Sequence, residues 1–321
     1  MRRRRSFLGG VVATSALLLA LCVSCGGSAS STASGAEVTA SSASEPLRET
    51  STTIVPASST TIASGSNSQV LELVDTSRPV VSNGRTVAST RSLPTTVWRP
   101  NRPGVFPLVV FAHGYRLGPP GYARFCAMLA DSGYVVAAPS FPLADESRGH
   151  GLNRDDIPNE ARDVSFVITA LRSSVVAPSI ASGAVGVAGH SDGADVALIV
   201  GYQQGYADPA VGAVVAVAPD AFSGQLSTNR PPLLLVHADA DATVPYSESV
   251  QVFAHVQGKR TFLTLVGADH LPPIAQNTVW TPTLDGAVVT FFDATLKHVQ
   301  TLESAQTLLG TLARSKVQVG S

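Results

Sequence analysis

The amino-acid sequence predicts an α/β fold: a mostly parallel, doubly wound β-sheet with an antiparallel N-terminal edge. Short apolar runs such as residues 108–112 and 233–236 contain no polar residue, as expected for parallel strands that are buried on both faces. Between such runs, apolar residues recur with the spacing of one helix face, as in residues 122–129. Strands that alternate with amphipathic helices in this way build a sheet covered by helices on both sides.

This fold is expected for only part of the 321-residue chain. Residues 70–298 have the length and composition of one α/β domain, and residues 299–321 are expected to form a surface helix and a frayed tail. The formal net charge is -1 and charged residues make up 14% of the chain. We therefore expect no basic surface and no nucleic-acid partner. We also expect a monomer.

Residues 1–25 have the organisation of a signal peptide: four arginines, an apolar run, and a serine and a cysteine at the end. Val23-Ser24-Cys25 resembles a lipobox, which predicts cleavage before Cys25 and acylation of that residue. Residues 4–8 also resemble a twin-arginine signal, so the general secretory and twin-arginine export routes both stay open. The apolar run is short for an uncleaved membrane span of about 20 residues.

Residues 26–69 consist mainly of Ser, Thr, Ala and Gly and contain few large apolar residues. Such a segment buries too little surface to fold, so we expect a disordered tether. Together with an acylated Cys25, the tether predicts an extracytoplasmic protein that is lipid-anchored to the cell membrane or secreted.

The domain is expected to open with an antiparallel edge and to continue with alternating strands and helices. The predicted strands are residues 70–74, 91–98, 108–112, 135–138, 185–188, 214–217, 233–236 and 261–266. The predicted helices are residues 122–129, 164–171, 194–200, 247–258 and 284–292, and a long polar loop covers residues 139–159. Cys126 lies on the apolar face of the first helix, and the other two cysteines belong to the signal peptide, so no disulfide framework is expected.

The pentapeptide Gly189-His190-Ser191-Asp192-Gly193 lies between a predicted strand and a predicted helix. This is the context in which G-x-S-x-G forms a nucleophile elbow: a tight turn presents the serine hydroxyl and requires very small neighbours. The following helix directs its first N–H groups towards the oxyanion that forms when a serine attacks a carbonyl. Since a chain rich in Gly and Ser also contains this pattern by chance, the flanking strand and helix are what favour catalysis.

Two further residues with catalytic chemistry follow later strands, and the order Ser191, Asp241, His270 is that of a serine hydrolase triad. An aspartate or histidine after a strand is, taken alone, more often a turn or solvated residue. At the carboxyl ends of neighbouring parallel strands, however, the three would meet at one edge of the sheet. Ser191 is then the nucleophile, His270 the general base and acid, and Asp241 the residue that orients the imidazole.

Asp239 lies at the end of the same strand as Asp241. The chain must turn after this strand before it can present a carboxylate to His270, so we expect the earlier Asp239 to be a turn residue. The backbone N–H groups of Asp192 and Tyr115 are the expected oxyanion donors, one after the nucleophile and one from the first loop that follows a parallel strand.

Several segments resemble secreted bacterial serine esterases of the α/β-hydrolase superfamily, of the group similar to platelet-activating-factor acetylhydrolases and dienelactone hydrolases. The matching segments are residues 75–79, 93–98, 111–115, 163–167, 189–193, 237–245 and 267–270. The resemblance implies the α/β-hydrolase fold and serine ester hydrolysis. Three departures are Ala194, where relatives often have a second glycine, Asp192, which places a carboxylate beside the oxyanion site, and the serine itself, because dienelactone hydrolases use a cysteine.

We therefore expect a carboxylic-ester hydrolase that forms an acyl-enzyme and needs neither a cofactor nor a metal. The interval between residues 217 and 233 is short and polar, so little or no lid is expected. An open groove walled by Tyr115 and Trp280 would accept acyl chains of roughly two to eight carbons and also bulky or polymeric esters.

Other functions remain open at this point. An acyltransferase or a peptidase could use the same residues, and a non-catalytic surface lipoprotein could keep the fold as a binding module. Labelling by a fluorophosphonate distinguishes the binding module from an enzyme. Comparison of p-nitrophenyl acetate with amide substrates distinguishes an esterase from a peptidase.

Overall fold

The computed structural model describes residues 55–60, 66–220 and 222–321. The predicted signal peptide (1–25), the predicted acylation site Cys25 and most of the predicted tether lie outside these residues. The described residues belong to one compact unit that extends to Ser321. Among them, no helix has the length and apolar character needed to cross a membrane.

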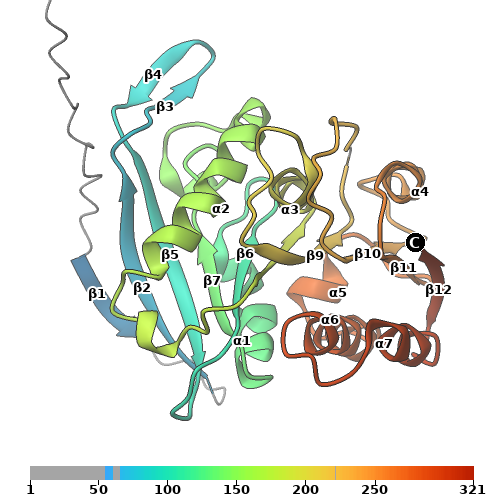
Figure 1. Cartoon of the computed structure of the whole chain (residues 1–321). Helices are drawn as coiled ribbons and strands as arrows, with labels where there is room; N and C mark the ends of the chain where they lie inside the picture. The colour runs from blue at the N-terminus through green and yellow to red at the C-terminus, as the bar shows by residue number, and fades with distance from the viewer. Residues whose placement is uncertain (1–54, 61–65, 221) are drawn as a thin grey trace, which may run out of the picture. The chain divides into compact units, whose positions relative to one another are not determined.

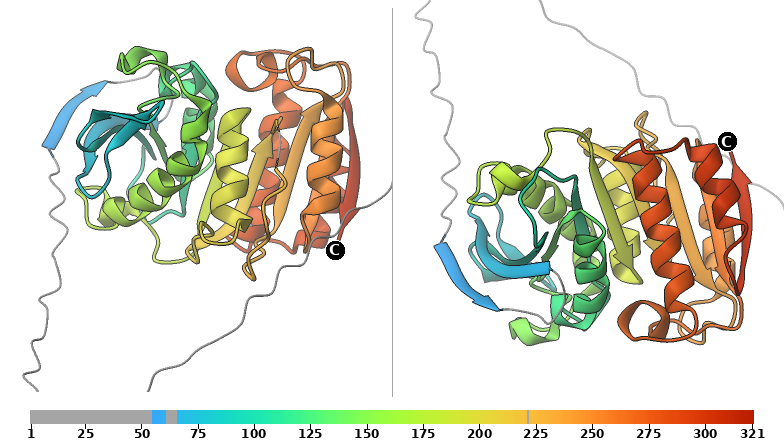
Figure 2. Two further views of the ribbon diagram at one scale, coloured as in Figure 1. Left: turned by 90° about the horizontal axis from the view of Figure 1, so that it is seen from above. Right: turned by 90° about the horizontal axis from the view of Figure 1, so that it is seen from below.

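The described residues form a ten-stranded sheet in the order β1-β2-β5-β7-β6-β8-β9-β10-β11-β12 (Figures 1 and 2). Its strands are β1 (Val55–Thr60), β2 (Ser66–Asp75), β5 (Arg91–Pro100), β6 (Leu108–Ala112), β7 (Val135–Pro139), β8 (Val185–His190), β9 (Val211–Val217), β10 (Leu233–Ala238), β11 (Arg260–Leu265) and β12 (Ser315–Gly320). Neighbours from β7 through β11 pair in parallel. The strands at both edges pair antiparallel. The predicted fold class is therefore confirmed.

Helices cover both faces of the sheet (Figure 2). One apolar core contains α2 (Ile157–Leu171), α3 (Asp192–Tyr202) and α4 (Tyr246–His255). The other contains α1 (Ala123–Asp131), α5 (Pro272–Ala275), α6 (Thr281–Thr295) and α7 (Leu302–Leu309). All five residues of β6 are buried, and they alternate between the two cores, because successive side chains of a strand point to opposite faces.

The folded unit is longer than the sequence predicts at both ends. Strand β1 and the first four residues of β2 fall within the predicted tether, and β12 falls within the predicted tail. Both outer strands are short edge strands that pair on one side only, a position that tolerates polar residues and even the proline at position 56. The tail beyond α7 is thus corrected from a frayed end to a strand paired with β11. A small hairpin, β3 (Val80–Ser82) with β4 (Arg85–Ala88), was also not predicted.

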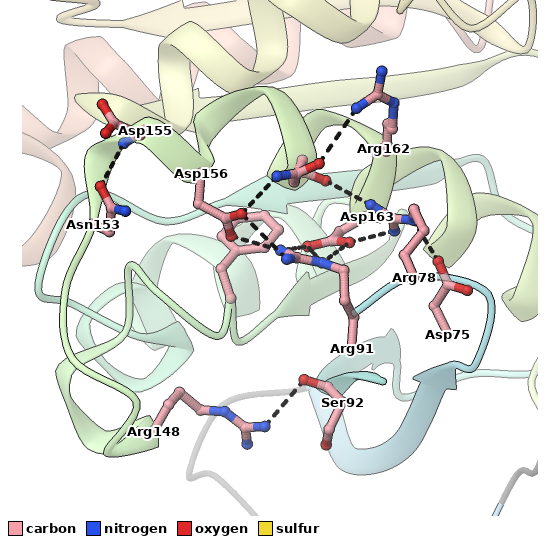
Figure 3. Close-up of polar contacts among 12 residues, drawn as sticks. Asp75, Arg78, Arg91, Ser92, Arg148, Asn153, Asp155, Asp156, Arg162 and Asp163 are labelled. Carbon is pink, nitrogen blue, oxygen red and sulfur yellow. Dashed lines mark hydrogen bonds and ion pairs between the residues drawn. The ribbon is translucent and has the colours of Figure 1, made fainter. Parts of the chain in front are cut away.

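A buried ionic cluster fastens the antiparallel edge to α2 (Figure 3). Arg91 of β5 is fully buried, and its Nη2 lies 2.5 Å from Asp163 Oδ2 and 2.7 Å from Asp156 Oδ2. Arg78 bonds Asp163 as well as Asp75. Removal of the Arg91 charge would leave the buried carboxylate of Asp156 without its cationic partner, which is strongly destabilising. The segments 75–79 and 163–167 that carry part of the superfamily resemblance therefore have a structural role.

Candidate active site

Ser191 occupies the turn between β8 and α3 with φ 57° and ψ −128°, a conformation that non-glycine residues rarely adopt. The space around the turn explains its two glycines. A Cβ on Gly189 would overlap the carbonyl of Gly193, and a Cβ on Gly193 would overlap the carbonyl of Ala112. The turn therefore has the geometry of a nucleophile elbow, with the serine at the N-terminus of a helix.

Asp241 and His270 follow β10 and β11, and these neighbouring parallel strands bring them together. Their atoms His270 Nδ1 and Asp241 Oδ2 are 2.6 Å apart. Asp241 Oδ1 accepts the backbone N–H groups of Thr243 and Val244, each at 2.8 Å. Burial raises the pKa of Asp241. Hydrogen bonds from the N–H groups of Val244 and Thr243 and from the imidazole of His270 lower it by a larger amount, so the pKa lies below its ordinary value. The carboxylate is ionised at neutral pH.

The other two aspartates of these loops are engaged by backbone N–H groups. Asp239 Oδ1 accepts the N–H of Gly267 at 2.6 Å. Asp269 Oδ1 accepts the N–H groups of Ala242 and His270 at 3.1 and 2.8 Å. Both side chains close the turns after their strands, and Asp241 is the carboxylate bonded to the imidazole of His270.

The backbone N–H groups of Tyr115 and Asp192 have no hydrogen-bond acceptor within the described chain, and both residues line one cavity with Ser191. The loop that carries Tyr115 is held by His113, which is fully buried. His113 Nε2 accepts the N–H of Phe141 at 3.0 Å, so its Nδ1–H donates to the carbonyl of Gly114 at 3.1 Å. His113 is therefore a support for this loop.

The cavity has a volume of about 830 Å³. It is lined by Gly114, Tyr115, Arg116, Leu117, Tyr122, Glu146, Arg154, His190, Ser191, Asp192, Asp220, Thr243, Val244, His270 and Leu271. Trp280, which is predicted to form part of the wall, is not among these residues. Its indole N–H donates to the carbonyl of Val266 at 2.9 Å and its ring packs against the apolar core, so that prediction is corrected.

The charged side chains of the cavity wall are paired. Arg154 binds Asp192 through two nitrogens, at 2.8 and 2.7 Å, and also binds Asp220 at 2.6 Å. At the rim, Arg116 and Glu146 are 2.8 Å apart. Among the described residues, no group of three or more His, Cys, Asp or Glu side chains is arranged to hold a metal ion.

Sequence reasoning missed Arg154 and Glu146 because they lie in the polar loop of residues 139–159, which contains no recognisable motif. The available signal was position: the loop follows a parallel strand and so emerges at the same sheet edge as Ser191. The apolar spacing predicts only a helix face for Tyr122, and the pentapeptide pattern predicts no separate role for His190. Both line the cavity.

A family model described as Chlorophyllase matches residues 64–250. The match contains the elbow and Asp241 and ends before His270. The family is an ester hydrolase group within the α/β-hydrolase superfamily, so it agrees with the predicted superfamily and differs from the two enzyme groups to which the motifs were compared. No curated protein matches the chain.

Proposed function

The chain belongs to the Chlorophyllase family, and we propose that it is a serine carboxylic-ester hydrolase that works through an acyl-enzyme. The observation that carries the proposal is the 2.6 Å contact between His270 and Asp241, because His270 lines the same cavity as Ser191 on its strained turn.

In this mechanism, Ser191 Oγ attacks the ester carbonyl while His270 Nε2 takes the hydroxyl proton. Asp241 accepts the Nδ1–H and stabilises the imidazolium. The N–H groups of Tyr115 and Asp192 receive the oxyanion, His270 returns the proton to the leaving alcohol, and a water then hydrolyses the acyl-enzyme by the same steps. The carboxylic acid leaves and the serine hydroxyl is restored.

We propose neutral esters with short-to-medium acyl chains, or bulky and polymeric esters, as substrates. Pairing of the charged wall residues supports a neutral ligand, since each of Arg154 and Arg116 is already engaged by carboxylates. The described residues between β9 and β10 include no helix, which supports a site without a helical lid. The proposal names the class of ester and not one particular acid, alcohol or polymer.

We further propose that the protein is a monomer. We also propose that it is extracytoplasmic, either lipid-anchored to the cell membrane or secreted, and the amino-acid pattern of residues 1–25 supports this location. If Cys25 carries the anchor, intact-mass analysis of membrane-extracted protein will find an acylated N-terminus at Cys25. An unmodified N-terminus further along the chain would contradict the anchor.

The experiment that tests the proposed reaction compares p-nitrophenyl esters of increasing acyl length with the matching p-nitroanilides. We expect the highest kcat/KM for acyl chains of roughly two to eight carbons, because longer chains gain about 0.8 kcal/mol per CH₂ only where a wall buries them. We expect turnover of the anilides to be far slower. A preference for anilides would contradict an esterase, and a rise in rate at the micellar threshold of a long-chain ester would contradict the absence of a lid.

A further inference from the structure

Three hydrogen bonds in series connect Gly114, Tyr122, His190 and His270. The N–H of Gly114 donates to Tyr122 Oη at 3.1 Å. Tyr122 Oη lies 2.9 Å from His190 Nδ1, and His190 Nε2 lies 3.1 Å from the backbone carbonyl oxygen of His270. The side chains of Tyr122 and His190 are buried, with relative exposures of 0% and 1%.

The chemistry of the two ends determines the direction of every proton in this series. The carbonyl of His270 can only accept, so His190 Nε2 carries a hydrogen. Burial lowers the pKa of His190 to about 3, so the ring is neutral and its Nδ1 is an acceptor. Tyr122 Oη therefore donates its proton to His190 and accepts the N–H of Gly114.

Aromatic packing holds the two side chains in place. The ring of His190 lies 4.6 Å from the ring of His270, measured between centroids, and Tyr122 lies 4.9 Å from Phe111 of β6. The series thus connects two loops that are distant in sequence. One loop contains Gly114 and the adjacent Tyr115, and the other contains His270.

We infer that Tyr122 and His190 are positioning residues. They hold the loop that carries the Tyr115 N–H, and the imidazole of His270, in position relative to Ser191. This inference rests on the proposed function. Neither side chain exchanges a proton with the substrate: Tyr122 acts through the backbone of Gly114, the residue before Tyr115, and His190 acts through the backbone of His270. Since a misplacement of about 1 Å can cost on the order of 10²-fold in rate, loss of one bond in the series should be visible in kcat.

The first test is Tyr122→Phe, with Tyr134→Phe as its matched control. Tyr134 is also fully buried in the same core and donates one hydrogen bond, to Asp293 at 2.6 Å, but it does not line the cavity. Active sites are titrated with a fluorophosphonate, so that kcat is expressed per functional site. We expect Tyr122→Phe to lower kcat per site by roughly 10- to 100-fold at unchanged KM, and Tyr134→Phe to keep the native kcat.

The second test compares two replacements of His190. In His190→Gln the side-chain amide N–H can take the place of Nε2 and reach the carbonyl of His270, whereas in His190→Asn the shorter amide can meet Tyr122 but not His270. We expect Gln to retain at least tenfold more kcat per site than Asn. A contribution to folding alone would lower the number of titrated sites and leave kcat per site unchanged in all of these variants.

Failure of the positioning role can be distinguished from failure of the proposed function. If the native chain hydrolyses esters through Ser191 while Tyr122→Phe and both His190 variants keep native kcat per site, the positioning role is wrong and the proposed function stands. If the native chain neither reacts with the fluorophosphonate nor hydrolyses any ester, the proposed function is wrong, and this inference fails with it.

Discussion

His270 Nδ1 lies 2.6 Å from Asp241 Oδ2, on a carboxylate whose other oxygen accepts two backbone N–H groups. His237 Nε2 approaches the same Oδ2 at 3.2 Å. Because the carboxylate is held at both oxygens, it presents one fixed acceptor to His270. That acceptor selects the tautomer with a hydrogen on Nδ1 and leaves Nε2 free to act as a base.

The loop after β10 offers an internal comparison of two aspartates. Asp241→Asn should lower kcat about 10⁴-fold, because the amide stabilises the wrong tautomer of His270. Asp239→Asn should lower kcat only slightly, since Asp239 bonds the backbone of Gly267 and not the imidazole. Steady-state kinetics on both variants, with circular dichroism to check folding, gives the ranking. The reverse order would assign the orienting role to Asp239.

Arg154 pairs with the carboxylate of Asp192, the residue after Ser191. Arg154→Gln should lower kcat roughly tenfold for a neutral ester, because an unpaired Asp192 opposes the negative charge that develops nearby. The loss should be larger for an ester with an anionic alcohol group. The double variant Arg154→Gln/Asp192→Asn should recover most of the rate, as measured in a double-mutant cycle. Equal losses in the single and double variants would show that Arg154 acts in some other way.

Glu160 of α2 is fully buried, and neither of its carboxylate oxygens has a hydrogen-bond partner within the described chain. Burial, followed by the charges of Asp156 and Asp163, raises its pKa well above the ordinary 4.5. Above pH 4.5 the unfolded chain releases this proton while the folded chain keeps it, so folding stability falls as pH rises until the raised pKa is reached.

Glu160→Gln removes this titration. The unfolding free energy of the variant minus that of the native chain should therefore increase by about 1.4 kcal/mol per pH unit as pH rises from 4.5 towards the raised pKa. Denaturant unfolding at pH 5, 6, 7 and 8 measures the slope, and a constant offset from the buried amide does not affect it. A difference that stays constant over this range would show that Glu160 ionises normally in the folded protein.

Much of this architecture follows from local pattern. The continuous apolar runs predict the parallel strands, because a strand covered on both faces has no side that requires polar residues. The pentapeptide around Ser191 predicts its turn, because the close approach of Ala112 and Gly193 leaves no room for larger residues at positions 189 and 193.

Features that depend on distant contacts were not predictable in the same way. Strand β12 has polar residues and is a strand because β11 offers an unpaired edge. The pairing of Arg154 with Asp192 joins a loop without a motif to the start of α3, and nothing in either segment alone indicates it. Trp280 lies after His270 in the chain, but its indole turns to the carbonyl of Val266 instead of the cavity.

The most direct test of the central claim is active-site labelling of the native chain and of Ser191→Ala, with Ser223→Ala, an exposed serine outside the cavity, as the control. We expect one fluorophosphonate adduct per chain, mapped to Ser191, in the native chain and in Ser223→Ala. We expect no adduct in Ser191→Ala, together with a loss of esterase activity on the order of 10⁶-fold. An adduct on another residue, or retention of more than a few per cent of the native rate by Ser191→Ala, would contradict the assignment of Ser191 as the nucleophile.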